Sequence, residues 1–323
     1  MPLLRVEHLK KYYGAPSPLF GPKRFVRALD DVSFELDEGE TLGLVGESGC
    51  GKSTLARQLI RLEEPTDGKI YLEDFDLGSL HGSALRAMRG KFQMIFQDPY
   101  ASLNPRMSVY SALEEALKLH TPLDEKARAD RIAELLKQVG LKPEHARRYP
   151  HQFSGGQRQR IGIARALAVN PRFIVADEPV SALDVSVQSQ IVNLLQDIQK
   201  ETGVAFLFIA HDLAVVEHIS HRIMVMYLGR LTETGPASEL CSHPAHPYTR
   251  ALLSSVPTTR PEKKHGRIIL EGDVPSPLNP PRGCRFHPRC PFRQAVCERE
   301  EPCLRPVGNN EKHLCACHFP VET

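Results

Sequence analysis

Residues Gly46 to Thr54 read G-E-S-G-C-G-K-S-T and follow the apolar run Thr41 to Val45. An apolar strand, closely spaced glycines and a Lys-Ser-Thr helix start form the arrangement that wraps backbone N–H groups around a polyphosphate. Here Lys52 would place a positive charge at the β- and γ-phosphates, and Ser53 would offer a hydroxyl to Mg²⁺. The helix N-terminus adds its partial positive charge. This stretch, the phosphate loop, predicts a site for ATP or GTP, with a purely structural glycine-rich turn as the alternative.

The bulk composition is that of an ordinary globular protein. The 323 residues are 41% hydrophobic and 25% charged, and the formal net charge of +2 gives no electrostatic argument for a nucleic-acid partner. The longest apolar run, Val204 to Ala210, is too short to cross a bilayer, and the N-terminus lacks the pattern of a secretory signal. We therefore expect a cytosolic protein.

Cysteines concentrate near the C-terminus, where six of the eight lie between Cys284 and Cys317. A reducing compartment disfavours disulfides, so a metal or cluster site is the expected reason for this concentration.

Strand and helix patterns alternate along most of the chain. Strands are expected at Leu3–Leu9, Val32–Leu36, Thr41–Val45, Lys69–Leu72, Phe92–Phe96, Phe173–Ala176, Val204–Ala210 and Ile223–Tyr227. Helices are expected at Leu55–Leu62, in two patterns over Ser108–Arg148, after Gln157, at about Val187–Lys200, at Leu213–Ile219 and at Tyr248–Ser254. A turn-rich insertion is expected at Tyr12–Pro18, and a proline-rich linker from Val256. This order predicts a largely parallel sheet covered by helices on both faces, with a helical insertion.

Polar side chains follow three of the expected strands. Asp177 and Glu178 come directly after Phe173–Ala176, where open α/β sheets bind ligands. Asp177 suits a Mg²⁺ ligand and Glu178 a base that orients and deprotonates the attacking water. Gln97 has an amide that could reach Mg²⁺ or water, and His211 could contact the γ-phosphate or brace the glutamate. The alternatives are helix-capping acids and a structural histidine.

A second helix start, Ser154-Gly155-Gly156-Gln157, offers another anion-binding N-terminus. One chain cannot aim two distant helix starts at the same phosphate, so this motif favours a second subunit.

The ordered set of these motifs resembles that of an ABC-transporter ATPase and covers roughly the first two-thirds of the chain. The tail, with His246-Pro247-Tyr248-Thr249, Pro280-Pro281-Arg282-Gly283-Cys284 and Arg289-Cys290-Pro291, is similar to that of dipeptide and oligopeptide importer ATPases. One departure is Phe153, which stands where the signature usually has Leu; we expect packing to change and phosphate contact to survive.

The resemblance implies an α/β P-loop NTPase fold of the ABC type. The family fold has a mostly parallel sheet, an antiparallel β edge, a helical subdomain at about residues 98–165 and a small cysteine-rich appendage. The expected domains are residues 1–255 for the ATPase and 256–323 for the C-terminal region. Residues expected around ATP are Tyr13, stacked on adenine with Tyr12 as the alternative, Gly46, Glu47, Ser48, Gly49, Cys50, Gly51, Lys52, Ser53, Thr54, Ser154, Gly155, Gly156 and Gln157. Ser53, Gln97 and Asp177 are the expected Mg²⁺ ligands, and Glu178, His211 and Gln97 the expected catalytic residues.

The resemblance also implies a mechanism by association. Two ATPase subunits, usually different chains, face each other with ATP between the phosphate loop of one and the Ser-Gly-Gly motif of the other. Their partners are two membrane permease subunits, contacted through the helical subdomain, and indirectly a peptide-binding protein. The expected function is an ATP-hydrolysing motor for peptide import at the cytoplasmic membrane face. The alternatives are a soluble ABC ATPase acting on ribosomes or DNA, and an importer of another small solute.

By the same likeness, Cys284, Cys290, Cys297 and Cys317 match four recurring cysteines, separated by five, six and nineteen residues. Four thiolates can hold a [4Fe–4S] cluster or a tetrahedral Zn²⁺, and the family favours the cluster. Cys315 competes with Cys317 for the fourth position, and His287 and His318 are reserve ligands.

Overall fold

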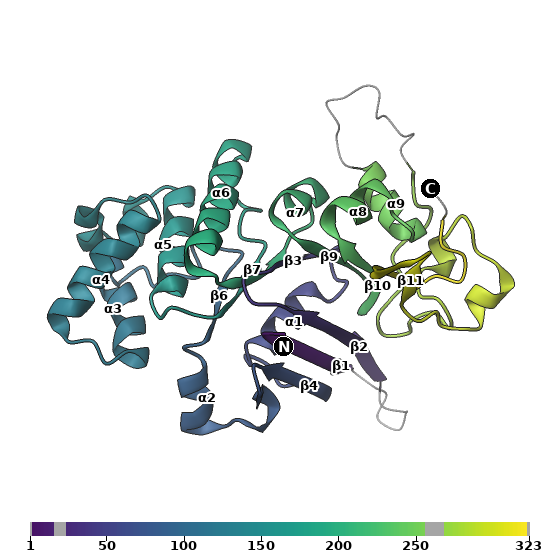
Figure 1. Ribbon diagram of the computed structural model, residues 1–323, viewed down its shortest axis with the longest axis horizontal. Helices are drawn as coiled ribbons and strands as arrows, with labels where there is room; N and C mark the ends of the chain where they lie inside the picture. The colour runs from purple at the N-terminus through teal and green to yellow at the C-terminus, as the bar shows by residue number, and fades with distance from the viewer. Residues whose placement is uncertain (1, 16–23, 256–267, 322–323) are drawn as a thin grey trace. The chain divides into compact units, whose positions relative to one another are not determined.

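The computed structural model describes residues 2–15, 24–255 and 268–321 (Figure 1). The chain divides into two compact units. The first unit comprises residues 1–36, 41–78 and 210–323, and the second comprises residues 37–40 and 79–209. The predicted linker begins at Val256, and residues 256–267 lie outside the described residues.

An antiparallel sheet forms the N-terminal part of the first unit, with strand order β2-β1-β4-β5. Its strands are β1 (Leu4–Ala15), β2 (Arg24–Leu36), β4 (Asp67–Leu72) and β5 (Phe75–Asp76). The predicted turn-rich insertion is wrong for Tyr12–Ala15, because these residues continue β1 and pair with Arg24–Arg27 of β2. Pro16 to Pro18 lie outside the described residues.

The first unit also contributes the strands β11-β12-β10-β9-β3 of a second sheet. The strand β3 (Thr41–Val45), predicted with these bounds, is fully buried and runs parallel to β9 (Arg222–Tyr227). β10 (Arg230–Pro236) continues antiparallel, followed by the hairpin of β12 (Asn310–Cys315) and β11 (Arg305–Val307). The helices of this unit are α1 (Lys52–Leu59), α7 (Leu213–Ile219), α8 (Ala237–Ser242) and α9 (Pro247–Ser254).

The second unit contains the parallel strands β8 (Ala205–Ile209), β7 (Phe173–Asp177) and β6 (Phe92–Ile95). Its helices are α2 (Gly82–Met88), α3 (Val109–His120), α4 (Glu125–Gln138), α5 (Gly155–Leu167) and α6 (Val185–Thr202). All five residues of β7 and of β8 are buried, as expected for parallel strands covered on both faces.

The predicted helical insertion consists of α3 and α4, which pack beside α5 (Figure 1). Ser108 and Asp124 begin the two helices by accepting hydrogen bonds from the N–H groups of Ser111 and Ala127. The apolar face predicted for α4 is buried, with Ile132, Leu135, Leu136 and Val139 at most 1% exposed.

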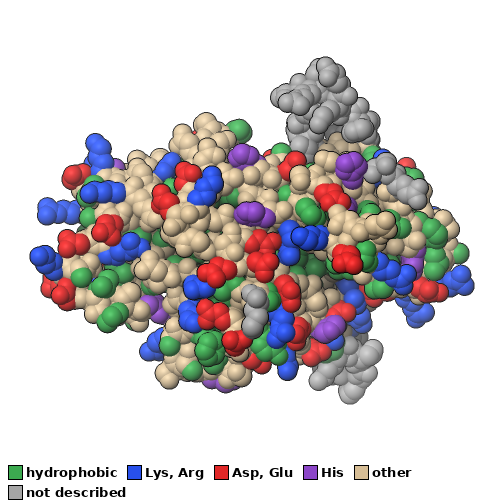
Figure 2. All heavy atoms as spheres, viewed as in Figure 1, with side chains coloured by type: hydrophobic (Ala, Val, Ile, Leu, Met, Phe, Trp, Pro, Cys, Tyr) green, Lys and Arg blue, Asp and Glu red, His purple; other side chains and the backbone are tan. Residues whose placement is uncertain are grey.

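The elements that the sequence missed include α2, β10 and the β11–β12 hairpin. The first four residues of β12 are polar, Asn310 to His313, so its sequence carries little apolar alternation. Within the described residues, no helix is both long and apolar enough to cross a membrane. Lys and Arg side chains are interspersed with Asp and Glu side chains on the face drawn in Figure 2, consistent with the near-neutral net charge.

Candidate ATP-binding and hydrolysis site

The phosphate loop has the backbone that its glycines predict. Gly49 and Gly51 adopt φ values of 77° and 113°, which favour glycine. A Cβ on Gly51 would lie 2.4 Å from the carbonyl oxygen of Ala28, so a side chain there would collide with backbone. The loop then enters α1 with Gly51 as the N-cap. This is the strand–loop–helix geometry that can hold a polyphosphate.

Lys52 is buried at the base of the loop. Its ammonium group donates to the carbonyl oxygens of Gly46 at 2.7 Å and of Glu47 at 3.1 Å, and its residue is 6% exposed. A buried ammonium held by loop carbonyls is placed to exchange these acceptors for phosphate oxygens. The donor set therefore fits a nucleoside polyphosphate.

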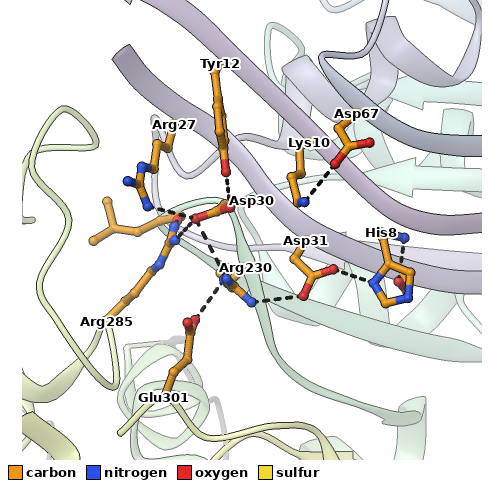
Figure 3. Close-up of polar contacts among 12 residues, drawn as sticks. His8, Lys10, Tyr12, Arg27, Asp30, Asp31, Asp67, Arg230, Arg285 and Glu301 are labelled. Carbon is orange, nitrogen blue, oxygen red and sulfur yellow. Dashed lines mark hydrogen bonds and ion pairs between the residues drawn. The ribbon is translucent and has the colours of Figure 1, made fainter. Parts of the chain in front are cut away.

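Tyr12 and Tyr13 project to different surroundings. The Tyr13 hydroxyl donates to the carboxylate of Glu63 and also hydrogen-bonds the side chain of Thr54, at the end of the phosphate loop. The Tyr12 hydroxyl instead donates to Asp30 (Figure 3). The geometry thus separates the two candidates for the adenine contact.

Asp30 is the centre of an ionic cluster drawn in Figure 3. Besides Tyr12, its carboxylate binds Arg285 from the C-terminal region and lies 3.7 Å from Arg27 and 3.8 Å from Arg230. Asp30 is 4% exposed. Tyr12 is therefore committed to a buried structural network.

In the second unit, Asp177 ends β7 and is 6% exposed. Glu178 follows with a φ of 47°, and its N–H donates to the carbonyl of Ile209 at 2.9 Å. The Gln97 amide donates to the Glu178 carboxylate at 2.8 Å. A left-handed glutamate is uncommon, and such conformations cluster at functional sites. The predicted Gln97 and Glu178 are thus brought into direct contact.

The Ser-Gly-Gly motif begins α5. The Ser154 hydroxyl accepts from the N–H of Gln157 at 3.3 Å, and the Gln157 side chain accepts from the N–H of Ser154 at 3.1 Å. Ser154 is exposed, whereas Phe153 is buried with its ring edge-on to His145 at 5.6 Å. The motif is presented outward on a well-capped helix.

His211 belongs to the first unit and is exposed, directly before Asp212, which caps α7 through the N–H of Ala214. Lys52 and His211 lie in the first unit, and Asp177, Glu178, Gln97 and Ser154 in the second. The residue roles stay predictions.

Two family models match parts of the chain. Residues 29–181 match the ABC transporter family, and residues 232–297 match the oligopeptide/dipeptide transporter C-terminal region. The chain is 51% identical over 321 residues to the oligopeptide transport ATP-binding protein AppF of Bacillus subtilis, covering 98% of this chain and 97% of that protein. It is 50% identical over 321 residues to the dipeptide transport ATP-binding protein DppF of Escherichia coli, covering 99% and 95%.

The chain belongs to the ABC transporter ATPase family. It falls within the peptide-transport branch of that family. A solved relative, the ATP-binding cassette MJ0796 in a dimeric post-hydrolysis state with ADP and Pi, is 29% identical with a TM-score of 0.64, covering 72% of this chain and 98% of that one. The predicted family, fold class and ATPase activity coupled to peptide transport are confirmed.

The C-terminal region of this ABC ATPase brings the four predicted cysteines together. Cys284, Cys290, Cys297 and Cys317 line one pocket. Cys315 is 1% exposed and lies outside that lining. His287 and His318 also line the pocket, but ring nitrogens of both bond backbone carbonyls, those of Cys284 and Glu300.

Two short 3-10 turns, His287–Arg289 and Ala295–Glu298, shape this pocket, and the N–H of Cys284 donates to the carbonyl of Cys297 at 2.8 Å. Burial raises the pKa of Cys284 and of Cys317 to about 11. In the described part of the chain, no three His, Cys, Asp or Glu side chains form a group that could hold a metal ion.

Sequence reasoning missed the partners of Glu47. Its N–H donates to the Tyr248 hydroxyl at 2.8 Å, and its carboxylate accepts from Arg289. Both partners stand in quoted motifs, but nothing in their sequence spacing indicates contact with the loop.

Proposed function

We propose that this ABC ATPase hydrolyses ATP, with the phosphate loop binding the nucleotide and the Gln97–Glu178 pair activating the attacking water, and so powers import of dipeptides or oligopeptides. The Gln97–Glu178 hydrogen bond carries the proposal, because it fixes a carboxylate at the carboxyl end of β7, where a water can be deprotonated. The names of the relatives, which are oligopeptide and dipeptide transport ATP-binding proteins, support the cargo class.

Each residue has a defined task in this mechanism. Lys52 binds the β- and γ-phosphates, and Ser53 and Asp177 hold Mg²⁺ with Gln97 beside them. Bound Mg²⁺ neutralises phosphate charge that develops during hydrolysis. Glu178 orients and deprotonates the attacking water, and His211 donates to the γ-phosphate. Tyr13 stacks on adenine, a role supported by its hydrogen bond to Thr54 at the end of the loop.

The outward-facing Ser154 supports a two-subunit site. Its helix start, which also carries Gly155, Gly156 and Gln157, would contact the γ-phosphate bound by a second ATPase subunit. The related cassette MJ0796 was solved as a dimer, which fits this arrangement. The second subunit is a related ATPase. Two membrane permease subunits would dock on the helical region at about residues 98–165 and place the protein at the cytoplasmic membrane face, with a peptide-binding protein as indirect partner.

Glu178→Gln tests the catalytic role. We expect the variant to bind ATP with unchanged affinity and to hydrolyse it at least about a hundredfold more slowly, because it removes the proton acceptor. Glu134→Gln, on the exposed face of α4, is the matched control. Turnover of the Glu178 variant within a few-fold of wild type would refute the assignment.

Purification of the protein together with ribosomes, instead of with two membrane subunits, would refute the transport role.

The four pocket cysteines support a [4Fe–4S] cluster as the bound group. A single Zn²⁺ needs sulfurs about 2.3 Å from one point, whereas a cluster takes one thiolate at each of its irons and so accommodates wider spacing. Four cysteines around one pocket are the observation that supports the cluster. Iron and sulfide in equal amounts, with visible absorbance, are the expected result for protein purified without oxygen. Stoichiometric zinc would reject the cluster.

A further inference from the structure

Glu47, the second residue of the phosphate loop, is held from two directions by residues of the stretch 232–297 that matches the oligopeptide/dipeptide transporter C-terminal region. Its N–H donates to the Tyr248 hydroxyl at 2.8 Å, across 201 residues of sequence. Its carboxylate accepts from two nitrogens of Arg289, at 2.7 Å to Oε2 and 3.3 Å to Oε1, across 242 residues. All three residues belong to the first unit.

The two holding groups are themselves fixed by burial. Tyr248 is fully buried, and its ring packs on Tyr227 at 4.8 Å and on Phe286 at 5.4 Å between centroids. The Arg289 side chain is 9% exposed, and that of Glu47 is 27% exposed. A two-point guanidinium–carboxylate contact with this little exposure has a defined geometry and is only weakly screened by solvent.

The charge of Glu47 makes this contact important for nucleotide binding. A carboxylate in a loop that receives a polyphosphate repels the ligand, and Arg289 compensates that charge at close range. The Tyr248 hydroxyl engages the Glu47 N–H and so fixes the backbone where the chain leaves β3. The Glu47 carbonyl in turn accepts from the Cys50 N–H at 3.3 Å, so the position of Glu47 also affects the turn of the loop that follows it.

We propose that Arg289 and Tyr248 are positioning residues for nucleotide binding, through which the transporter-specific stretch 232–297 sets the affinity of the phosphate loop. Arg289 ends the 3-10 turn His287–Arg289, and the next residue, Cys290, lines the cysteine pocket. The loop and the pocket are therefore joined by one short turn. The inference rests on nucleotide binding at this loop.

Binding of a fluorescent, non-hydrolysable ATP analogue with Mg²⁺ to the full chain tests the inference. Arg289→Met should weaken binding by about tenfold to a hundredfold, since it leaves a half-buried carboxylate uncompensated. Arg289→Lys, which keeps the charge but loses the two-point contact, should fall between Met and wild type. Tyr248→Phe should weaken binding by about two- to tenfold.

The control variant is Arg299→Met, in the same region but exposed, with its side chain bonded to the carbonyl of Ala295. It should bind like wild type. The decisive variant is Glu47→Gln combined with Arg289→Met, which removes the uncompensated charge. It should bind within about threefold of Glu47→Gln alone, a recovery that a general loss of structure could not produce.

Thermal unfolding midpoints establish that each variant is folded. Binding by Arg289→Met equal to that of Arg299→Met would overturn the inference, as would a double variant no better than Arg289→Met. Lys52→Ala distinguishes a wrong positioning role for Arg289 from a wrong assignment of the nucleotide site to the phosphate loop. If Lys52→Ala still binds, the nucleotide site is elsewhere; if it loses binding while Arg289→Met does not, only the inference fails.

Discussion

Replacement of Asp30 by Asn should destabilise the protein, although Asp30 contacts no predicted ATP residue other than the alternative Tyr12. Its carboxylate binds Arg285 (Figure 3). Arg285 is 8% exposed and also donates to the carbonyl of Leu228. Asn keeps the shape and an acceptor for the Tyr12 hydroxyl, but it removes the charge. Arg285 then keeps only neutral acceptors, the Leu228 carbonyl and the new amide oxygen, and loses its carboxylate.

The magnitude follows from this burial. Removing one partner of a buried ion pair costs about 3–5 kcal/mol, because the other charge stays buried and uncompensated. The remaining amide oxygen and the Leu228 carbonyl reduce that cost, so we expect about 3 kcal/mol. For a chain of this size that loss lowers the unfolding midpoint by about 6 °C, at roughly 2 °C for each kcal/mol.

The pH dependence has a definite sign. Burial alone raises the pKa of the Asp30 carboxyl, but the hydrogen bond from Tyr12 and the charges of Arg285 and Arg230 outweigh burial and lower it below the ordinary 3.8. A lowered folded pKa gives stability that is complete above 3.8 and is lost as the pH falls below it. The difference in free energy of unfolding between wild type and Asp30→Asn should therefore be constant near neutral pH and shrink below about pH 4.

The assay is thermal unfolding followed by circular dichroism from pH 7 to pH 3, with Asp67→Asn as the control. Asp67 pairs with Lys10 at 2.8 Å, but its side chain is 65% exposed, so its replacement should leave the midpoint unchanged. Equal midpoints for Asp30→Asn and Asp67→Asn at pH 7 would refute the argument that burial decides the strength of this cluster.

Three further predictions follow from contacts described above. Tyr13→Ala should weaken ATP binding by about tenfold in a fluorescence titration, by loss of about 1–2 kcal/mol of stacking, whereas Tyr12→Phe should leave affinity unchanged and lower only the unfolding midpoint. Cys317→Ser should abolish stable iron incorporation, and Cys315→Ser should retain it. Metal analysis that finds iron in the Cys317 variant but not in the Cys315 variant would assign Cys315 as the fourth ligand. His313 donates to the buried carboxylate of Glu233 at 2.7 Å, and this hydrogen bond raises the pKa of His313. His313→Gln should therefore lower the free energy of unfolding by about 2 kcal/mol below pH 6.5, and by less as the pH rises above it, in denaturation measured across that range.

Local sequence determined the elements whose signals lie within a few residues of one another. The phosphate loop, β3 and α7 have the bounds or form predicted, because glycine spacing, apolar runs and capping residues act within a few positions. Gln97 and Glu178 were also identified from their places after strands, since parallel strands bring their carboxyl ends to one edge.

Tertiary structure decided what depends on partners far away in the chain. β1 extends to Ala15 because β2 pairs with it, and the hairpin β11–β12 is ordered against β10, whose sequence lies about 80 residues earlier. Tertiary contacts also give the neighbouring residues Tyr12 and Tyr13 different partners. Tyr13 hydrogen-bonds Thr54, whereas Tyr12 donates to Asp30.

The C-terminal region shows the difference most clearly. Sequence determined that Glu47 belongs to the phosphate loop and that four cysteines recur near the end of the chain. Only the folded chain placed Cys317, and not Cys315, at the pocket and Arg289 on Glu47. Spacing along the chain encodes local backbone geometry, whereas the pairing of charges and thiols across hundreds of residues is fixed by which buried surfaces pack together.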